Sequence, residues 1–315
     1  MRIAWGTSKL LWMYLHNTGD TAWDYVIDDF SELSHYEGIP VRRSGFLAQE
    51  SLAGCQVYIF AVSNGSVQAI LARLAEFGMM LGERVHLYSE LMSGHFKDLL
   101  KSHLGWRADE TLLNYATSIT VNSKKLIHTT LCGNWFFLEA VHHLHHLAGD
   151  IAEVGCFEGG NALMCLQSRL WQGDRRYLLF DSFEGFPALA PEDPATSAAG
   201  DYAPAKLYGE IVAAFAPFKG VEIIKGFVPD TFRAVPDDRR FSIVFFDCDL
   251  YQPALDTFAF FWNRIEKGGI LLIHDYLTEP GGFTGVAKAV HQFFDPLGIK
   301  VLPFWPTTMA AVVKT

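Results

Sequence analysis

The sequence predicts an α/β protein with two sheets of mainly parallel strands, each covered by helices. Short apolar segments alternate with segments of helical periodicity along most of the chain, which is typical of parallel sheets. Several apolar segments also end in a glycine turn or an acidic residue. The 315 residues suffice for two domains with separate cores. We expect a small α/β domain over 1–92, a helical connecting segment over 93–130, and a larger domain over 131–315.

The composition excludes several classes of partner. Half of the residues are apolar, 14% are aromatic, and the formal net charge is −10. Nucleic acids and anionic membranes require a basic face, so we expect neither as a partner. The apolar run 10–15 is too short to span a membrane. The aromatic-rich helices are compatible with a homo-oligomer.

The cysteines indicate a reducing compartment. They are scattered, odd in number, and show neither pairing nor metal-ligand spacing, which is typical of reduced thiols in a cytoplasmic protein. The five are Cys55, Cys132, Cys156, Cys165 and Cys248.

The first ninety residues predict the smaller, Rossmann-like sheet. The continuously apolar segment 57–62 is typical of a strand buried on both faces. A turn at Gly6 follows the first strand, where nucleotide-binding folds place a phosphate. It lacks the further glycines and the lysine of phosphate-binding loops, which favours a domain without a cofactor. The expected strands are 3–5, 24–28, 57–62 and 84–88, and the expected helices are 8–16 and 66–77.

A histidine-rich helix is predicted over 135–147. Two of its histidines, His142 and His146, would share one helix face, a spacing that a transition metal can use. No glutamate follows His142 as in the zinc-protease pattern. A polar helix face is therefore the favoured interpretation.

The sequence of the larger domain predicts seven strands, with a helix over 161–170 after the first strand. The connection 305–308 between the last two is too short for a crossover, so that pair must be antiparallel. Parallel strands closed by an antiparallel hairpin form the Rossmann-like sheet of class I methyltransferases. The expected strands are 150–154, 177–181, 221–224, 241–247, 269–274, 300–304 and 309–313.

A glycine turn follows the first strand of this sheet. Glu153 lies two residues before Gly155, and Gly159 lies four residues after it. This spacing is how methyltransferases hold the methionine part of S-adenosylmethionine, with helix N–H groups aimed at the ligand. A dinucleotide fingerprint would require glycine at Phe157, so a nicotinamide dehydrogenase is disfavoured.

Acidic residues lie at the ends of four of the first five strands of the predicted sheet. Glu153, Asp181, Asp247 and Asp275 would therefore meet at one sheet edge, where ligands of open α/β sheets bind. Asp181 follows Glu153 at the distance expected for a carboxylate that grips a ribose diol.

Asp247 and Asp275 would face the methyl acceptor. Two carboxylates there repel each other unless a cation lies between them, and oxygen ligands suit Mg²⁺. Such a metal would lower the pKa of the hydroxyl to be methylated. Asp249 would complete the site or act as general base. Asp247-Cys248-Asp249 also resembles the D-x-D of glycosyltransferases, which the upstream glycine turn disfavours.

Five ordered motifs within residues 118–315 resemble the macrocin O-methyltransferase family. The resemblance implies an enzyme that depends on S-adenosylmethionine and Mg²⁺ and methylates a hydroxyl of a small-molecule acceptor, a sugar or glycosylated metabolite. It implies that Glu153, Gly155 and Asp181 bind the cofactor and that Asp247 and Asp275 bind the metal. The motifs are Glu153–Gly160, Asp181–Pro187, Lys225–Phe232, Asp247–Tyr251 and Gly268–Tyr276.

We therefore expect three overlapping sets of site residues. The catalytic set is Asp247, Asp249 and His274, and the metal set is Asp247, His274 and Asp275. The cofactor-binding set is Glu153, Gly155, Cys156, Phe157, Gly159, Asp181, Ser182, Gly226, Phe227 and Asp247.

One position departs from the family pattern, which ends the fifth strand in two acids and a tyrosine. This chain has His274-Asp275-Tyr276. Imidazole is a poor ligand for Mg²⁺ and a good one for Mn²⁺, Fe²⁺ or Zn²⁺. Either the metal preference has moved, or His274 is a base, or the metal is weak or lost. We favour a retained metal; the alternative is a catalytically weakened binding or assembly module in sugar or polysaccharide biosynthesis.

Two loops are expected near the acceptor. Residues 186–208 are rich in proline and alanine and form a long excursion, which is typical of a lid. The glycine-rich stretch 281–285 follows the metal strand and would shape the acceptor pocket.

Overall fold

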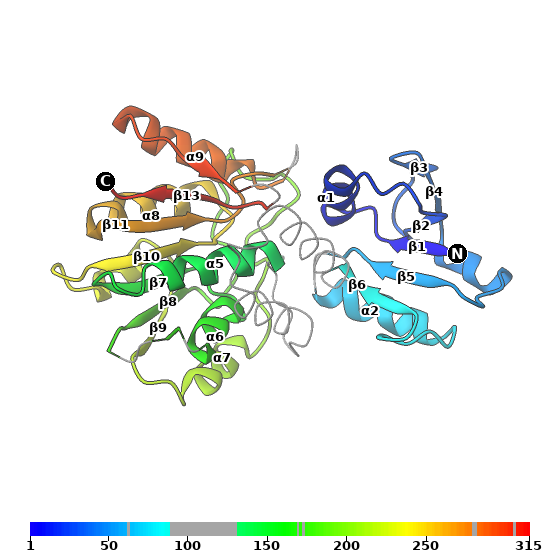
Figure 1. Ribbon diagram of the computed structural model, residues 1–315, viewed down its shortest axis with the longest axis horizontal. Helices are drawn as coiled ribbons and strands as arrows, with labels where there is room; N and C mark the ends of the chain where they lie inside the picture. Colours follow the sequence, from blue (N-terminus) through cyan, green and yellow to red (C-terminus); the bar gives the residue numbers. More distant parts are fainter. Residues whose placement is uncertain (62–63, 89–130, 169, 172–173, 279–281, 305–306) are drawn as a thin grey trace. The chain divides into compact units, whose positions relative to one another are not determined.

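The computed structural model describes residues 1–315 except 62–63, 89–130, 169, 172–173, 279–281 and 305–306. The chain divides into two compact units, Met1–Leu131 and Cys132–Thr315 (Figure 1). The expected connecting segment 93–130 lies outside the described residues. In the part that is described, no helix combines the length and the apolar character that a membrane crossing needs.

The first unit holds a six-stranded sheet in the order β3-β4-β2-β1-β5-β6. All of its strands pair in parallel except β3 with β4, which form a hairpin. The sequence predicts β1, β2, β5 and β6 and misses the hairpin. The strands are β1 (Arg2–Trp5), β2 (Tyr25–Ile27), β3 (His35–Tyr36), β4 (Ile39–Arg42), β5 (Gln56–Ile59) and β6 (Val85–Leu87); the helices are α1 (Lys9–Thr18), α2 (Asn64–Ala75) and the 3₁₀ helix η1 (Ser44–Gln49).

Alternate residues of β1 face opposite sides of this sheet. Ile3 and Trp5 pack in a core that includes Val67 of α2. Ala4 points the other way and packs with Leu11 of α1. The predicted turn at Gly6 is present, with a φ of 110°. The sheet is therefore covered on both faces, as expected for parallel strands.

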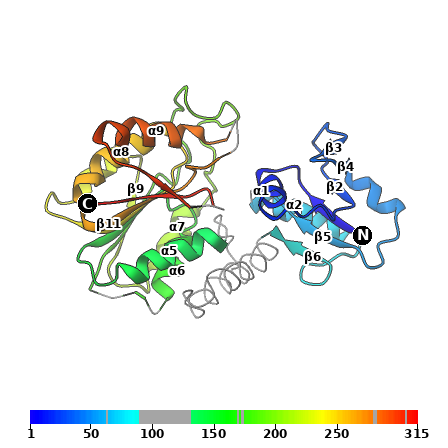
Figure 2. The ribbon, with the colours of Figure 1, turned by 45° about the horizontal axis from the view of Figure 1, so that its top comes forward.

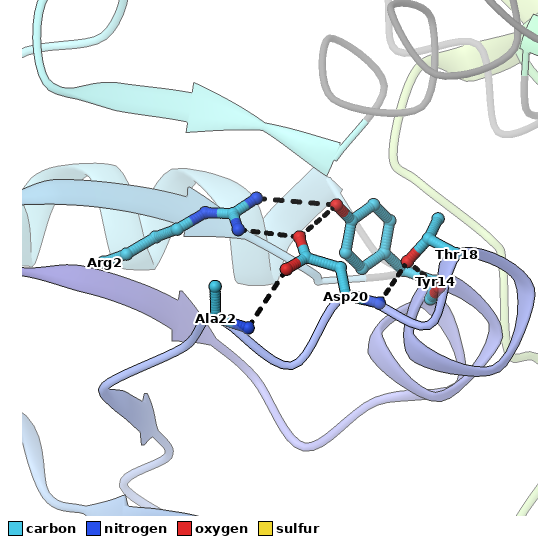
Figure 3. Close-up of polar contacts among 5 residues, drawn as sticks. All are labelled: Arg2, Tyr14, Thr18, Asp20 and Ala22. Atoms are coloured by element: carbon cyan, nitrogen blue, oxygen red, sulfur yellow. Dashed lines mark hydrogen bonds and ion pairs between the residues drawn. The ribbon is translucent and has the colours of Figure 1, made fainter.

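A polar network joins the end of α1 to the start of β1 (Figure 3). The Asp20 carboxylate accepts hydrogen bonds from the Arg2 guanidinium and from the Tyr14 hydroxyl, both at 2.6 Å. The same carboxylate accepts the backbone N–H of Ala22 at 3.1 Å. Burial raises the pKa of Tyr14 to about 12, and the hydrogen bond to Asp20 adds to the effect.

The second unit holds a seven-stranded sheet in the order β12-β13-β11-β10-β7-β8-β9. Strands β7 to β11 pair in parallel, and β13 runs antiparallel to both β11 and β12. The predicted class I methyltransferase sheet is confirmed. Its strands are β7 (Asp150–Val154), β8 (Tyr177–Asp181), β9 (Val221–Lys225), β10 (Phe241–Phe246), β11 (Ile265–Ile273), β12 (Leu302–Pro303) and β13 (Ala310–Val313).

Helices cover both faces of this sheet. Helices α8 and α9 lie on one side, and α5 and α6 lie on the other (Figure 2). Phe246 of β10 contacts Phe258 of α8, with ring centroids 5.5 Å apart. Its neighbour Phe245 contacts Phe137 of α5 on the opposite face, at 5.7 Å. The helices are α5 (Leu131–His143), α6 (Gly160–Gln167), α7 (Leu207–Phe215), α8 (Tyr251–Phe261) and α9 (Thr284–Phe294), with the 3₁₀ helices η2 (Asp230–Ala234), η3 (Trp262–Arg264) and η4 (Asp295–Leu297).

The predicted helix 135–147 is wrong at its C-terminal end. Helix α5 ends at His143, so His142 and His146 do not share a helix face. Arg175 explains the early end, because its guanidinium donates to the carbonyl oxygens of Leu144 and His145 at 3.0 and 2.7 Å. Carbonyls beyond the last turn are thereby satisfied without further helix.

Other predicted bounds are also too long. Strand β5 ends at Ile59 rather than at residue 62, and β12 is limited to Leu302–Pro303. The expected lid 186–208 ends earlier, because α7 begins at Leu207. Thr284 and Gly285, predicted as loop, belong to α9.

The polar network of the first unit predicts a stability effect. Replacing Asp20 with Ala leaves the partly buried Arg2 and Tyr14 without their shared acceptor, so we expect a loss of about 1–3 kcal/mol in the free energy of unfolding. Urea unfolding followed by fluorescence measures it. The exposed Glu83 provides the control, since Glu83→Ala should change stability by less than about 0.5 kcal/mol. Equal effects of the two variants would contradict the prediction.

Candidate functional site

The carboxyl ends of four adjacent strands bring the expected site residues together. Val154 of β7 pairs with Phe246 of β10 and Phe180 of β8, and Phe246 pairs in turn with Ile273 of β11. The residues that follow these four therefore lie at one level of the same sheet edge. They are Gly155, Asp181, Asp247 and His274.

Gly155 makes the closest approach at this edge. Its φ is 90°, and a Cβ atom there would lie 2.1 Å from the carbonyl oxygen of Asp247. The Asp247 N–H donates to the Val154 carbonyl at 2.8 Å, which holds the two turns together. No residue with a side chain fits at position 155 unless the backbone of β10 moves.

Asp181 organises the glycine turn from the neighbouring strand. Its two carboxylate oxygens accept the backbone N–H groups of Phe157 (2.8 Å) and Phe183 (2.7 Å). Its own carbonyl accepts the N–H of Gly226 at 2.9 Å, which fixes the turn after β9. Burial raises the pKa of Asp181, although these N–H groups oppose the rise. Each carboxylate oxygen keeps a second acceptor position for a ligand hydroxyl.

Glu153 lies beneath the turn rather than on the open edge. Glu153 is 1% exposed, and its carboxylate accepts a hydrogen bond from the Tyr177 hydroxyl at 2.9 Å. Burial raises the pKa of Glu153 to about 8, against hydrogen bonds from Tyr177 and Asn161. The predicted contact between this carboxylate and the cofactor therefore needs a rearrangement of the turn, whereas a supporting role does not.

The remaining expected cofactor residues lie in three turns. Cys156 is buried, and Phe157 follows it with a φ of 43°. Ser182 is engaged locally, because its hydroxyl donates to the Gly185 carbonyl at 2.8 Å. Phe227 is 37% exposed after Gly226. At Gly159, at the start of α6, a Cβ atom would lie 2.6 Å from the ring of Phe215.

The acidic cluster comprises Asp247, Asp249, His274 and Asp275. One ligand atom from each can be chosen so that all lie within 4.8 Å of one another. His274 Nδ1 lies 2.9 Å from Asp247 Oδ1 and 2.9 Å from Asp275 Oδ2. Its Nε2 lies 3.0 Å from the hydroxyl of Thr308. The four side chains that we expect to carry metal chemistry thus converge.

The cluster concentrates negative charge in a half-buried place, where only Asp275 is fully buried. Burial raises the pKa of Asp249, and Asp275 and Asp247 raise it further. Burial alone would lower the pKa of His274, but the carboxylates of Asp247 and Asp275 outweigh it and raise this pKa well above its usual range. An imidazolium between two carboxylates is one way to balance such charge, and a cation is the other.

The donor set fits a divalent cation. Three carboxylates supply the oxygen ligands that Mg²⁺ and Mn²⁺ prefer, and an imidazole nitrogen shifts the preference towards Mn²⁺, Fe²⁺ or Zn²⁺. Among the residues that the structure describes, no other group of histidine, cysteine and acidic side chains converges in this way.

Tyr202, which the sequence analysis missed, packs against the glycine turn after β7. Its ring contacts Phe157 of the turn and Phe186 of the loop, with centroids 5.8 and 5.0 Å apart. Partial burial raises the pKa of Tyr202 to about 12, and Asp249 and Asp275 add to the rise, although 44% of the residue is exposed. Its aromatic side chain within a loop rich in proline and alanine is the only sequence signal that could have identified it.

Three other contacting residues have no such signal. Tyr177 and Asn161 support Glu153, and Thr308 supports His274. In the sequence, Tyr177 is predicted only as a strand residue, Asn161 only as the start of a helix, and Thr308 only as part of a hairpin connection. Only the pairing of the strands brings them to the site.

Comparison with known proteins finds one family in the second unit. The family model TylF, macrocin-O-methyltransferase, matches residues 137–302. The chain is 26% identical over 162 residues to the 8-demethyl-8-(2,3-dimethoxy-alpha-L-rhamnosyl)-tetracenomycin-C 4'-O-methyltransferase of Streptomyces olivaceus. It is 24% identical over 164 residues to the mycinamicin III 3''-O-methyltransferase of Micromonospora griseorubida. The matches cover 48% of this chain and 60% and 62% of those relatives, so the chain spans about 60% of their length.

A solved structure agrees on the fold. CalS11, a calicheamicin methyltransferase, aligns with a TM-score of 0.50 and 19% sequence identity. The alignment covers 65% of this chain and 91% of CalS11. At that identity the likeness shows the class I methyltransferase fold alone.

The buried Glu153 predicts a pH dependence of stability. Its pKa of about 8 in the folded protein exceeds its ordinary value of 4.5, so the folded state binds the proton more tightly. The free energy of unfolding should therefore fall as the pH rises from about 4.5 to about 8. In Glu153→Gln this fall should vanish, while the Tyr177 hydroxyl keeps an acceptor.

Urea unfolding at about pH 5 and about pH 9 measures this effect. The stability of Glu153→Gln relative to the natural chain should rise between the two. Glu210→Gln, at an exposed position of α7, is the control and should show no such trend. A pH-independent difference between Glu153→Gln and the natural chain would contradict the assignment.

Proposed function

The chain belongs to the TylF macrocin-O-methyltransferase family, and from this membership we propose that residues 131–315 transfer a methyl group from S-adenosylmethionine to a hydroxyl, with help from a divalent metal. The observation that carries the proposal is the adjacency of two sites on one sheet edge. The turn held by Asp181 lies beside the cluster that includes Asp247 and His274.

We propose a sugar or a glycosylated metabolite as the acceptor. The two curated relatives are by name a 4'-O-methyltransferase of a rhamnosyl tetracenomycin and a 3''-O-methyltransferase of mycinamicin III. Sugars present hydroxyls on adjacent carbons, and two vicinal oxygens suit a metal with open positions. A weakened binding module is the less favoured alternative, because Asp181, Asp247 and Asp275 are all retained.

The cofactor is assigned to the turns around Asp181. The Asp181 carboxylate would accept the ribose hydroxyls, and the exposed ring of Phe227 is available for stacking on the adenine. Backbone N–H groups at the start of α6 would face the methionine part. Glu153 would support the turn without contacting the cofactor, because its hydrogen bond with Tyr177 joins β7, the strand that leads into the turn, to β8.

The reaction is a displacement at the methyl carbon. The acceptor oxygen forms a bond to carbon as the carbon–sulfur bond breaks, and the hydroxyl proton passes to a base. A metal held by Asp247, His274 and Asp275 would lower the pKa of that hydroxyl. Asp249 is the favoured base, because it lies in the same cluster and is not one of the three residues assigned to the metal. His274 is already engaged by Asp247, Asp275 and Thr308.

Cofactor binding gives the direct test of this proposal. Titration calorimetry with S-adenosylmethionine and S-adenosylhomocysteine should detect binding by the full chain. Asp181→Asn should weaken it at least ~10-fold, because a charged acceptor is lost. Asp238→Asn, an exposed acid after η2, should leave the affinity unchanged. Failure of the natural chain to bind either compound at millimolar concentration would end the proposal.

Metal removal tests the second site. With rhamnosylated acceptors and labelled S-adenosylmethionine, EDTA should lower the rate by at least about 100-fold, and Mn²⁺ or Mg²⁺ should restore it. Asp275→Asn should show a similar loss, with S-adenosylhomocysteine affinity kept within about threefold. Full activity in EDTA combined with an inactive His274→Ala would contradict the metal role and favour His274 as the base.

A further inference from the structure

The loop between β8 and α7, residues 182–206, is fastened at its base. The Phe186 N–H donates to the Asp201 carbonyl at 2.9 Å, and the Gly200 N–H donates to the Phe186 carbonyl at 3.0 Å. Gly185 permits this close return, because a Cβ atom there would lie 2.3 Å from the Asp201 carbonyl oxygen. The loop therefore doubles back on itself beside the cofactor turn.

Asp193 fastens the far part of this loop to helix α8. Its Oδ1 accepts the backbone N–H of Tyr251, the first residue of α8, at 2.7 Å. Its Oδ2 accepts the N–H of Ala190 at 2.8 Å within the loop. Helix α8 begins after Leu250, whose side chain has no capping oxygen. An acid 58 residues earlier thus supplies the cap that the helix itself lacks.

The hydrogen bond between Asp193 and the Tyr251 N–H fixes the chain next to the acidic cluster. Asp249 lies two residues before Tyr251 and has a φ of 64°, a left-handed conformation that a residue with a side chain adopts only at a cost. Such a conformation persists when its surroundings fix it on both sides. On one side the Asp247 N–H is bonded to the Val154 carbonyl at 2.8 Å, and on the other the Tyr251 N–H is bonded to Asp193.

Helix α9 also packs closely against the Asp193 carboxylate. Gly285 lies in the first turn of α9, and a Cβ atom there would lie 2.8 Å from Asp193 Oδ1 and 3.0 Å from the Cβ of Tyr251. The Asp193 side chain is therefore held between the first turns of α8 and α9. Its charge also complements the positive N-terminal ends of both helices.

We propose that Asp193 is a positioning residue, which fixes Asp249 and the acidic cluster through its bond to the Tyr251 N–H and holds the loop over them. The loop is then a fixed wall of the acceptor site at this end rather than a swinging lid. The inference rests on the proposed function for the role of the cluster, while the bond itself can be tested without it.

Variants of Asp193 separate the bond from the charge. Asp193→Ala removes both, whereas Asp193→Asn removes the charge and keeps an oxygen for the Tyr251 N–H. The matched control is Glu192→Gln, which removes the adjacent carboxylate of the same loop. Each full-length protein is titrated with Mn²⁺ alone and, separately, with S-adenosylhomocysteine, and its amide hydrogen exchange is followed by mass spectrometry over residues 247–253.

Asp193→Ala should weaken Mn²⁺ binding by about tenfold, the scale expected for loss of a helix cap, and should speed exchange over 247–253. Asp193→Asn and Glu192→Gln should stay within about threefold of the natural chain. The affinity for S-adenosylhomocysteine should change less than about twofold in all of them. A general loss of folding would instead weaken the binding of both Mn²⁺ and S-adenosylhomocysteine.

Two results would overturn the proposal. One is an equal loss of Mn²⁺ affinity in Asp193→Asn and Asp193→Ala, which would make the charge and not the bond responsible. The other is unchanged exchange over 247–253 in Asp193→Ala. If the natural chain binds no Mn²⁺, the metal part of the proposed function fails, and the exchange result alone decides the role of Asp193.

A glycine pair provides an independent test. Gly285→Ala adds a methyl group against Asp193 without removing any charge, so it should speed exchange over 247–253 and weaken Mn²⁺ binding as Asp193→Ala does. Gly209→Ala in α7 is the control, because a Cβ atom there meets nothing within 4 Å. Exchange in Gly285→Ala equal to that of the natural chain would contradict the contact between α9 and Asp193.

Discussion

The close approach of Gly155 to the carbonyl of Asp247 is the constraint on which the site depends. A Cβ atom at position 155 would lie 2.1 Å from that oxygen, so the backbones of the turns after β7 and β10 can be in direct contact only because the residue is glycine. One turn leads to the start of α6 and the other leads to Asp249. The glycine turn and the acidic cluster consequently lie side by side on one sheet edge, which is the arrangement that the proposed in-line methyl transfer needs.

The second condition is that the acids of this edge are each stabilised in a different way. Backbone N–H groups hold Asp181, and the Tyr177 hydroxyl holds Glu153, whose raised pKa of about 8 allows it to be neutral. Asp247 and Asp275 share the ring of His274. Because the means of compensation differ, one sheet edge can hold a neutral Glu153 close to several other carboxylates.

The sequence predicts the strands of the second unit well and its contacts poorly. Strands β7 and β8 have the predicted bounds, because Gly149 and Gly155 enclose the first and the acid Asp181 ends the second. The hairpin of β3 and β4 was missed because its strands are two and four residues long in a polar segment. The end of α5 is set by Arg175, and the start of α8 by Asp193, both distant in sequence.

Site residues follow the same division. The acids at strand ends can be identified from the sequence, since parallel strands end at one edge. The direction of a side chain depends on its partners, so the burial of Glu153 beside Tyr177 was not foreseen. Tyr202 reaches Phe157 of the glycine turn through a loop whose path is fixed by tertiary contacts, and no local pattern encodes such a path.

His274 shows how the sheet accommodates the departure from the family pattern. The Leu277 N–H donates to the Thr308 carbonyl at 3.1 Å, which draws the connection between β12 and β13 against the segment after β11. The Thr308 hydroxyl then lies 3.0 Å from Nε2 of His274, while Nδ1 lies between two carboxylates. Both ring nitrogens therefore have partners, which makes the imidazole an ordered member of the cluster. The hairpin that closes the sheet is thus also the element that orients this histidine.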